Sequence, residues 1–409
     1  MKQVQVAVIG GGAAGLMAAV TAAKTGANVL LLEGNPRPGK KLLATGNGRC
    51  NLTNLHISPA RYHGDGAEAA ELLARYPAEK IMAEFEKLGL LCRADSEGRV
   101  YPNSLQAAAV LQVLWSACEE VGVEMRWDFP VSDLKREQGG FLIANAEGET
   151  IFARRCVLAS GGKASPKHSR GDGYSLAKNL GHTVTPLVPA LVPLKTPMKL
   201  CRSLKGIRCK AKAALYGDGK KLGEESGEVL FGDNQLSGIC IFNLSSLLSN
   251  SLPRAEKAWE IELDLLEQWE EKRLLSYWKQ LGKNRPNLPA GELFFGVLPL
   301  WVGQELTKLI KLPKEKALAD LDEKTLLRAA QTAKALRIPV TGPGSWENAQ
   351  VTAGGIPLAE IDLNTMESKK CPGLYLAGEL LNVNGDCGGY NLHWAWLTGM
   401  AAGEHAGKP

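Results

Sequence analysis

The feature that most constrains this chain is its N-terminal segment, in which an apolar run leads directly into a glycine-rich turn. The run Val4–Ile9 predicts a buried strand, and the small residues after the turn predict a helix that ends near Lys24. A second apolar run, Val29–Leu32, ends on the acid Glu33. Strand, glycine turn, helix, strand and acid in this order predict the βαβ unit of a dinucleotide-binding fold.

The glycines of the turn have separate physical roles. Gly10 allows the tight turn, Gly12 lets the backbone approach a pyrophosphate, and Gly15 lets the helix pack close to the strand. The phosphates would bind free N–H groups at the positive end of the helix dipole, and Glu33 would accept bonds from a ribose hydroxyl. A secretory signal peptide is the alternative, but glycines within the apolar core and the closing acid argue against it. The predicted contacts here are Gly10, Gly12, Ala13, Ala14, Gly15, Glu33 and Gly34.

The composition of the 409 residues is that of a soluble enzyme, with 45% apolar and 22% charged residues, and the length suggests two or three domains. No apolar run reaches the ~18 residues that a membrane span requires, so we expect no membrane contact. The nine cysteines are scattered and form no CxxC pair. This pattern predicts reduced thiols in the cytoplasm rather than disulfides or a metal site.

The character of the sequence changes twice along the chain. Residues 1–190 alternate strand-like and helix-like segments, and this pattern returns in residues 344–409. Residues 191–250 and 335–343 contain short strand-like segments separated by glycine turns, whereas residues 251–334 are predicted to be helical. The apolar residues at helical spacing in the last segment are Trp259, Leu263, Leu266, Trp269 and Leu274. We expect an α/β fold in which a discontinuous Rossmann-like domain is interrupted by a β-rich domain and a helical subdomain.

Three further segments favour FAD over NAD as the bound nucleotide. The loop Gly39–Asn54 lies just beyond Glu33, where an FAD domain lays an extended loop along its cofactor. Ala159–Gly162 has small residues that can approach a cofactor, and Leu374–Glu379 ends in a Gly-Glu pair that suits a ribityl chain. The turn Gly385–Leu392 opens a helix that suits the N1/O2 edge of a flavin, which gains negative charge on reduction. The predicted contacts are Lys41, Gly48, Arg49, Cys50, Asn51, Ser160, Gly161, Gly162, Gly378, Glu379, Gly388, Gly389, Tyr390, Asn391 and Leu392.

Short motifs along the chain form a specific combination: GRCNLTN, GRVYPNS, SGGKASPKHSRGDGYSLAKNLGH, GEVLF, SGI, TMESK, and AGELL followed by GGYNLHWAW. Together they resemble the BaiN/RdsA family of flavoproteins, also described as aminoacetone-oxidase-like, and the resemblance covers essentially the whole chain. It implies an FAD domain that carries an inserted β-barrel-like domain and a helical cap, and an NAD(P)H/FAD oxidoreductase. Activities suggested in that family include reduction of a steroid enone, reduction of a uridine in ribosomal RNA and oxidation of a small amine.

Three side chains are candidates for reacting groups beside a flavin. Cys50 and Cys387 fall in loops that we place near it, where a thiol close to a helix N-terminus has a lowered pKa. The alternative for both is a small, buried, inert cysteine. His393, one turn into the helix after the glycine turn, could polarise a carbonyl or donate a proton, and its alternative is a structural hydrogen bond.

Basic residues gather in two segments. Lys163, Lys167, His168 and Arg170 form either an anion site at the edge of the flavin domain or an exposed basic loop. Residues 195–221 contain nine Lys and Arg but one acid. There Arg208, Lys210 and Lys212 alternate with small residues and would share one face of a strand. That face is either solvated or a substrate-binding surface for RNA phosphates, an anionic small molecule or NADPH.

The expected chemistry follows from one flavin site without a second redox centre. The insertion has no second glycine fingerprint, so a pyridine nucleotide would dock transiently at the face that the substrate uses. We expect an NAD(P)H-driven reductase of a conjugated C=C or C=N bond, acting on an enone small molecule or a uridine in ribosomal RNA. The alternatives are an aminoacetone-type amine oxidase that uses O2 and a non-catalytic FAD protein of assembly or sensing. The sequence leaves the oligomeric state open.

Overall fold

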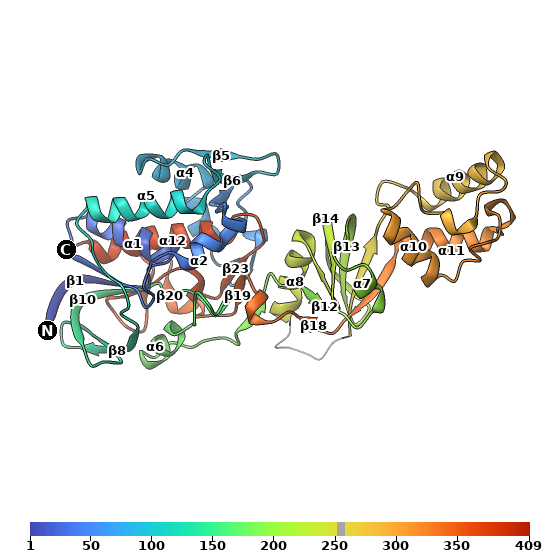
Figure 1. The fold of residues 1–409 in the computed structure, drawn as a ribbon. Helices are drawn as coiled ribbons and strands as arrows, with labels where there is room; N and C mark the ends of the chain where they lie inside the picture. Colours follow the sequence, from blue (N-terminus) through green and yellow to red (C-terminus); the bar gives the residue numbers. More distant parts are fainter. Residues whose placement is uncertain (252–257) are drawn as a thin grey trace. The chain divides into compact units, whose positions relative to one another are not determined.

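The computed structural model describes residues 1–251 and 258–409, which divide into two compact units (Figure 1). The first unit comprises Met1–Ala190 and Trp346–Pro409, and the second comprises Leu191–Ser345. Among the described residues, no helix is long and apolar enough to cross a membrane.

A mainly parallel sheet forms the centre of the first unit, in the order β20-β21-β22-β10-β1-β2-β7. Strand β9 pairs with β10 and β8 pairs with β9, both in antiparallel fashion. The strands that run parallel are β1 (Lys2–Ile9), β2 (Val29–Leu32), β7 (Glu124–Arg126), β10 (Thr150–Leu158) and β22 (Leu374–Leu376). The remaining strands of this sheet are β8 (Val131–Glu137), β9 (Gly140–Asn145), β20 (Ile361–Asp362) and β21 (Glu367–Ser368). The predicted strand–helix–strand order at the N-terminus is observed, and the mixed α/β prediction is confirmed.

Smaller elements cover this sheet. The helices are α1 (Ala13–Lys24), α2 (Lys40–Ala44), α3 (Ala70–Arg75), α4 (Ala78–Lys87), α5 (Ala107–Glu120), α6 (Gly173–Asn179) and α12 (Tyr390–Gly407). The minor sheets contain β3 (Thr53–Asn54), β5 (Cys92–Ala94) and β6 (Arg99–Pro102), β4 (Tyr62–Gly64) with β23 (Val383–Gly385), and β11 (Val188–Ala190) with β19 (Val351–Ala353).

Helices α1 and α12 pack unusually close together because glycines replace side chains along the contact. A Cβ atom at Gly399 would lie 2.4 Å from the carbonyl oxygen of Ala14, and one at Gly403 would lie 2.3 Å from that of Ala18. These glycines recur every four residues, so they fall on one face of α12. The close contact holds the second half of α12 along α1, two segments far apart in the sequence.

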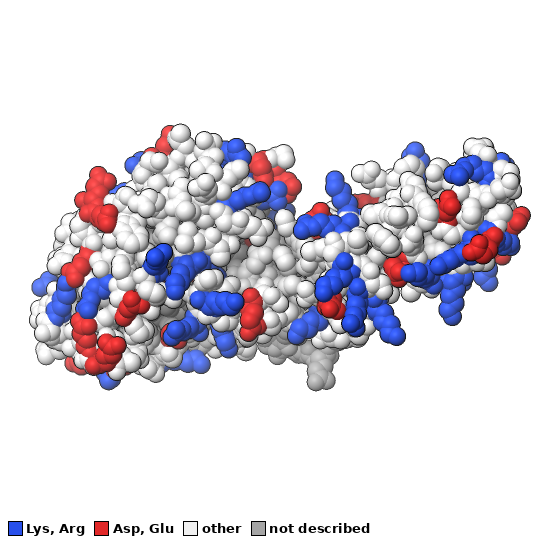
Figure 2. All heavy atoms as spheres, in the orientation of Figure 1, with Lys and Arg blue, Asp and Glu red and all other residues white. Residues whose placement is uncertain are grey.

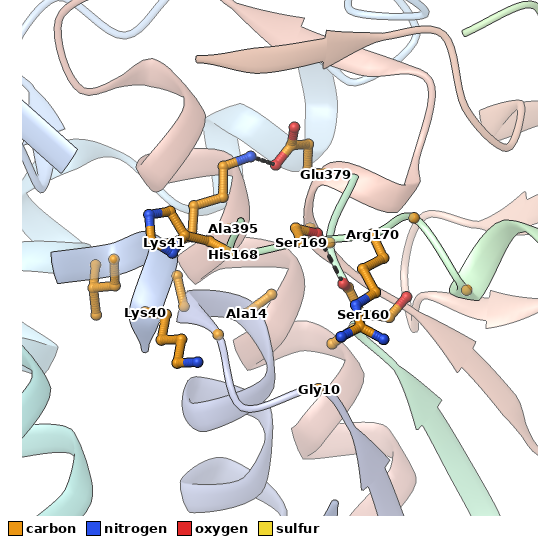
Figure 3. A pocket seen from close by; sticks show the side chains of 18 of the residues that line it. Gly10, Ala14, Lys40, Lys41, Ser160, His168, Ser169, Arg170, Glu379 and Ala395 are labelled. Carbon is orange, nitrogen blue, oxygen red and sulfur yellow. Dashed lines mark hydrogen bonds and ion pairs between the residues drawn. The ribbon is translucent and has the colours of Figure 1, made fainter. Parts of the chain in front are cut away.

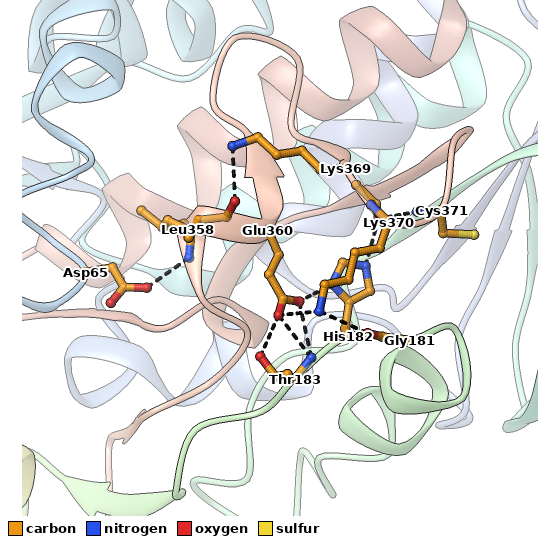
Figure 4. Close-up of polar contacts among 11 residues, drawn as sticks. Asp65, Gly181, His182, Thr183, Leu358, Glu360, Lys369, Lys370 and Cys371 are labelled. Carbon is orange, nitrogen blue, oxygen red and sulfur yellow. Dashed lines mark hydrogen bonds and ion pairs between the residues drawn. The ribbon is translucent and has the colours of Figure 1, made fainter.

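A polar network around the buried side chains of His182 and Ser368 fastens the chain after α6 to the segment around β20 and β21 (Figure 4). His182 uses both ring nitrogens, since Nδ1 lies 2.7 Å from a carboxylate oxygen of Glu360 and Nε2 lies 2.8 Å from the Ser368 hydroxyl. Burial lowers the pKa of His182, partly offset by its carboxylate partner. Burial also raises the pKa of Glu360, but hydrogen bonds from Lys370, Thr183 and His182 outweigh it and bring the pKa to about 2.

The second unit is built on a seven-stranded sheet in the order β17-β16-β13-β14-β15-β12-β18. Its strands are β12 (Leu194–Lys195), β13 (Arg208–Gly217), β14 (Lys220–Gly232), β15 (Gln235–Ser237), β16 (Trp259–Asp264), β17 (Leu336–Val340) and β18 (Gly342–Pro343). Helices α7 (Lys199–Ser203) and α8 (Ile239–Ser251) accompany the sheet. The prediction that residues 251–334 are helical is wrong at β16, whose side chains alternate between buried and half-buried along the strand. Residues 252–257 of that prediction lie outside the described part of the chain.

The helical part of the second unit contains α9 (Glu271–Asn284), α10 (Leu300–Leu309) and α11 (Glu323–Lys334). Its core includes the fully buried Trp278, whose ring meets Phe294 edge to face at 5.7 Å. We retain the division of this unit into a β-rich and a helical part as a proposal.

Candidate functional site

A cavity of about 410 Å³ lies in the first unit where the parallel strands end (Figure 3). Its lining comes from the ends of β1, β2 and β10, from the starts of α1 and α12, and from the loop between β10 and α6. The carboxyl edge of a doubly wound sheet is where such folds bind ligands. The cavity is therefore the candidate site.

The glycine turn opens one side of the cavity. Gly10 has a φ of +110°, and a Cβ there would lie 2.4 Å from the carbonyl oxygen of Ala159. A Cβ on Gly15 would lie 1.8 Å from the Gly10 oxygen, whereas one on Gly12 would meet no atom within 4 Å. Gly12 is the N-cap of α1, and no side chain caps this first turn. Packing thus requires Gly10 and Gly15, while Gly12 leaves space beside the positive end of a helix.

Glu33 is held rigidly at the end of β2. One carboxylate oxygen accepts a hydrogen bond of 2.7 Å from the backbone N–H of Gly11, and the other accepts one of 2.7 Å from that of Asn35. The side chain is buried and lies in the cavity lining. A fixed carboxylate at this position can accept hydrogen bonds from ribose hydroxyls.

A second carboxylate closes the other part of the cavity. Glu379 lies 2.5 Å from the ammonium of Lys41 and accepts a hydrogen bond of 2.8 Å from the backbone N–H of Thr352. A Cβ on Gly162 would lie 2.4 Å from the Thr352 hydroxyl, so glycine is required where the strand end meets these groups. The contact between Lys41 and Glu379 joins residues 338 positions apart in the sequence, and no local pattern predicts it.

The Lys167–Arg170 loop supplies cations to the same cavity. Within the described residues, Lys167 and Arg170 contact no carboxylate, and two buried polar atoms of the lining, Ser160 Oγ and His168 Nδ1, lack a hydrogen-bond partner. Buried polar groups rarely remain unsatisfied. Free N–H groups, unpaired cations and unsatisfied donors together fit a ligand that carries phosphates and hydroxyls, as FAD does.

The structure gathers many of the predicted cofactor contacts around the cavity. Those in the lining are Gly10, Gly12, Ala13, Ala14, Glu33, Gly34, Lys41, Ser160, Gly161, Gly378, Glu379, Asn391 and Leu392. Those outside the lining are Gly15, Gly48, Arg49, Cys50, Asn51, Gly162, Gly388, Gly389 and Tyr390. Lining residues that the prediction missed include Asn35, Lys40, Thr45, Phe129, Pro130, Val131, Gln350, Val351, Val383 and Trp394. Four of them, Asn35, Phe129, Pro130 and Gln350, are loop residues, and the others lie in helices and strands that only tertiary contacts bring to the site.

The predicted reacting groups are not gathered in the lining. Cys50 is fully buried, and burial raises the pKa of its thiol to about 12, so it is not an activated thiol. His393 is fully buried, its Nδ1 lies 2.8 Å from the Thr53 hydroxyl, and burial lowers its pKa to about 4. These surroundings fit the structural alternatives for both residues. Cys387 is half-buried, with its sulfur 3.7 Å from the Oε1 of Gln350, a lining residue.

The basic face predicted on β13 exists, but its charges are largely paired. Arg208, Lys210 and Lys212 do point away from the buried side of the strand. The neighbouring strand β14 then places carboxylates beside them, since Arg208 pairs with Glu228 at 2.5 Å and Lys212 pairs with Glu224 at 3.0 Å. Lys210 lies opposite Glu228 in the strand register. Figure 2 likewise shows acidic side chains among the basic ones on the visible surface. Two of the three predicted cations are therefore already paired, and a substrate-binding role for this face stays a prediction.

Among residues 1–251 and 258–409, no group of three or more His, Cys, Asp and Glu side chains could hold a metal ion. The nine cysteines are all free.

The chain matches the family described as "HI0933-like protein Rossmann domain" over residues 4–405. It is 36% identical over 408 residues to a 3-dehydro-bile acid delta(4,6)-reductase of Clostridium scindens, covering 99% of each protein. It is 27% identical to a ribosomal RNA dihydrouridine synthase of Escherichia coli, covering 99% of this chain and 98% of the relative. Its fold is similar to the crystal structure of a 3-ketosteroid delta1-dehydrogenase from Sterolibacterium denitrificans, with a TM-score of 0.51, 14% identity and full coverage of both chains.

Proposed function

The chain belongs to the HI0933-like family, which confirms the predicted relationship, and from this membership and the cavity we propose that it is an FAD-dependent, NAD(P)H-driven reductase of a conjugated double bond. The observation that carries the proposal is the glycine turn at the start of α1, because it combines free N–H groups with open space at Gly12. Helix N-termini of this kind bind phosphate groups.

Residues of the first unit would each hold a different part of FAD. The start of α1 and the Lys167–Arg170 loop would bind the diphosphate, and Glu33 would bind the adenosine ribose. Glu379 would bind the ribityl hydroxyls, and the start of α12 at Asn391 would face the flavin ring. When bound, FAD would supply a hydride that it had accepted from NAD(P)H.

The names of the relatives suggest the kind of bond that is reduced. A delta(4,6)-reductase of a 3-keto bile acid acts on double bonds conjugated with a ketone. Dihydrouridine is uridine whose C5–C6 double bond, conjugated with a carbonyl, has been saturated. Both substrates therefore share an alkene polarised by a neighbouring carbonyl group. We propose this electronic arrangement as the substrate class of the present chain.

A small enone is the first substrate candidate, since the relative named as a bile acid reductase is the more similar of the two. Uridine in structured RNA is the second candidate. It is favoured by the charge of the second unit, which has 24 Lys and Arg against 18 Asp and Glu, a net charge of +6. Such an excess attracts a polyanion without reading its sequence.

Stopped-flow absorbance of the purified protein tests the proposal. Rapid bleaching of the flavin by NADH or NADPH, slow reoxidation by O2 and fast reoxidation by an enone would support a reductase. Fast bleaching by aminoacetone would instead indicate an amine oxidase, and no response to either would favour an assembly or sensing role.

The Glu33→Arg variant tests the cofactor site separately. It removes the ribose contact and places a cation beside the N–H of Gly11, so we expect at least a tenfold weaker retention of FAD. A folded Glu33→Arg protein that keeps its full flavin content would contradict this assignment.

A further inference from the structure

A second cavity in the first unit, of about 230 Å³, lies between α1, α4 and α12. Among the described residues, its lining and that of the cavity proposed for FAD have no member in common. Pockets for drug-sized ligands measure roughly 300–1,000 Å³, so this cavity, which we call the helix groove, would hold a smaller molecule. The proposed function leaves it without a role.

Regular spacing on three helices builds the helix groove. Helix α1 contributes residues at spacings of three and four from Met17 to Lys24, and α4 contributes every fourth residue from Lys80 to Leu88. Residues at these spacings share one face of a helix. Met400 and Glu404, four apart on α12, form the third side. The glycine contacts between α1 and α12 hold two of the three sides together.

The bottom of the helix groove is apolar. Met17, Val20 and Met400 are buried, and Leu88 of the same lining is half-buried. The ring of Tyr76, which follows α3, is also buried in this lining. Methionine side chains are flexible and adapt to the shape of an apolar ligand. Such a surface favours an alkyl chain, because a polar group would lose its hydrogen bonds to water there.

The rim of the helix groove carries two exposed lysines. Within the described residues, neither Lys24 nor Lys80 forms an ion pair. Lys80 donates a hydrogen bond of 3.2 Å to the carbonyl oxygen of Arg75 and lies 3.8 Å from the centre of the Tyr76 ring. Both ammonium groups therefore remain available for an anionic ligand.

The two acids of the lining already have partners outside it. Glu84 is bound to Lys87 at 2.6 Å, and Glu404 is bound to Lys408 at 3.1 Å. The lining thus contains equal numbers of lysines and acids, but its acids are neutralised by neighbours and its lysines are not. This difference in pairing favours an anion over a cation in the groove.

Both lysines lie at the same end of the helix groove. Helices α1 and α12 run side by side in the same direction, because successive glycines of α12 contact successive turns of α1. Lys24 and Glu404, each in the last turn of its helix, are therefore close to one end. Burial raises the pKa of Tyr76, and the nearby Glu404 carboxylate raises it further. Since Lys80 lies over the Tyr76 ring, it belongs to the same end.

We propose that the helix groove binds a free medium-chain carboxylic acid, a role independent of the proposed function. The alkyl chain would lie on the apolar bottom of the groove, and the carboxylate would bind Lys24 and Lys80. Burial of the chain supplies most of the affinity, and the two cations select an anionic head group. A phosphate dianion fits less well, because Glu404 repels it more strongly than it repels a carboxylate with a single charge.

Isothermal titration calorimetry of the purified protein tests this site, with FAD added in excess to fill the first cavity. Octanoate should bind with saturation at about one molecule per chain, in line with a single groove of this kind. Neutral 1-octanol should bind about 10-fold more weakly, because it forms no ion pair with the lysines. Acetate, which has the carboxylate but no alkyl chain, should not bind.

Two variants test the two parts of the groove separately. Lys24→Ala combined with Lys80→Ala should weaken octanoate binding about 10-fold and leave 1-octanol within about 2-fold of wild type, since only the cations are removed. Thr21→Phe places a ring in the groove at a half-buried position of α1 and should abolish binding of both probes. Lys178→Ala combined with Lys220→Ala, on the exposed surfaces of α6 and β14, is the matched control and should bind both probes as wild type does.

The double lysine variant decides the question where Thr21→Phe fails to fold, because its changes lie on the exposed rim. Equal octanoate affinity in that variant and in its matched control would overturn the inference, as would octanoate that gives no saturable heat with wild type. Sedimentation velocity provides the remaining outcome. A dimer that octanoate leaves intact and that Thr21→Phe abolishes would overturn the inference and assign the groove to a second copy of the chain.

Discussion

The Lys167–Arg170 loop of the first unit and strand β13 of the second carry similar sets of cations in different surroundings. On β13, two of three cations are bound to carboxylates of β14. In the loop, Lys167 and Arg170 have no acidic partner among the described residues and line a cavity. Cations that already have partners contribute to folding, whereas unpaired cations in a cavity are available for an anionic ligand. We therefore propose that phosphate groups bind in the first unit, although the second has the larger net charge.

The largest expected effect comes from removing a fully paired charge. Glu360→Gln takes away the acceptor shared by Lys370, Thr183 and His182, and should lower the free energy of unfolding by about 3 kcal/mol. Chemical denaturation measures this change. Glu404→Gln, which breaks the exposed pair with Lys408, is the control and should cost less than about 1 kcal/mol. Equal losses in the two variants would contradict the distinction between a carboxylate shared by several partners and a single exposed pair.

The same network predicts how stability depends on acid. Glu360 has a pKa of about 2 in the folded chain against an ordinary value of 4.5, so its contribution is complete above pH 4.5 and is lost as the pH falls towards 2. The lowered pKa of His182 acts in the same direction below 6.5, because the unfolded chain binds that proton more readily. Thermal unfolding midpoints should fall with pH across this range, and Glu360→Gln should flatten the part below 4.5. A steeper acid dependence in that variant would refute the assignment.

Removal of an unpaired cation should affect the ligand rather than the fold. Arg170→Ala should raise the dissociation constant of FAD about 10-fold, since a charge-assisted hydrogen bond to phosphate is lost, with little change in unfolding. Fluorescence titration of apoprotein with FAD measures this, and riboflavin, which lacks the diphosphate, should bind both proteins equally. Lys178→Ala on the exposed surface of α6 is the control. Equal FAD affinities in Arg170→Ala and Lys178→Ala would remove the loop from the site.

The smallest effect is expected on β13. Changing Arg208, Lys210 and Lys212 together to Ser breaks two exposed ion pairs and should alter the free energy of unfolding by less than about 1 kcal/mol. Binding to ribosomal RNA fragments at low salt should change less than about 2-fold, because two of the three lost cations were already paired with carboxylates. A tenfold loss of RNA affinity would show that the pairs open for a polyanion.

The sequence predicted the parts of the molecule that depend on local spacing. The glycine turn, α1 and Glu33 follow from neighbouring residues, and all three meet at the cavity. The segment Trp259–Asp264 contains an apolar–acidic alternation that indicates a strand. The helical spacing of Trp259 and Leu263 with later apolar residues predicts a helix instead, and this prediction is wrong. Partners such as Glu228 beside Arg208, or Asp386 beside His63, depend on strand pairing and loop packing, which no local pattern encodes.

The central claim is that the cavity of the first unit binds FAD. It is tested most directly by purifying the protein, recording its absorbance and measuring the cofactor released on denaturation. The account predicts a yellow protein with a flavin spectrum that releases about one FAD per chain, in line with one dinucleotide site. A colourless, folded protein that takes up NAD but not FAD would contradict it.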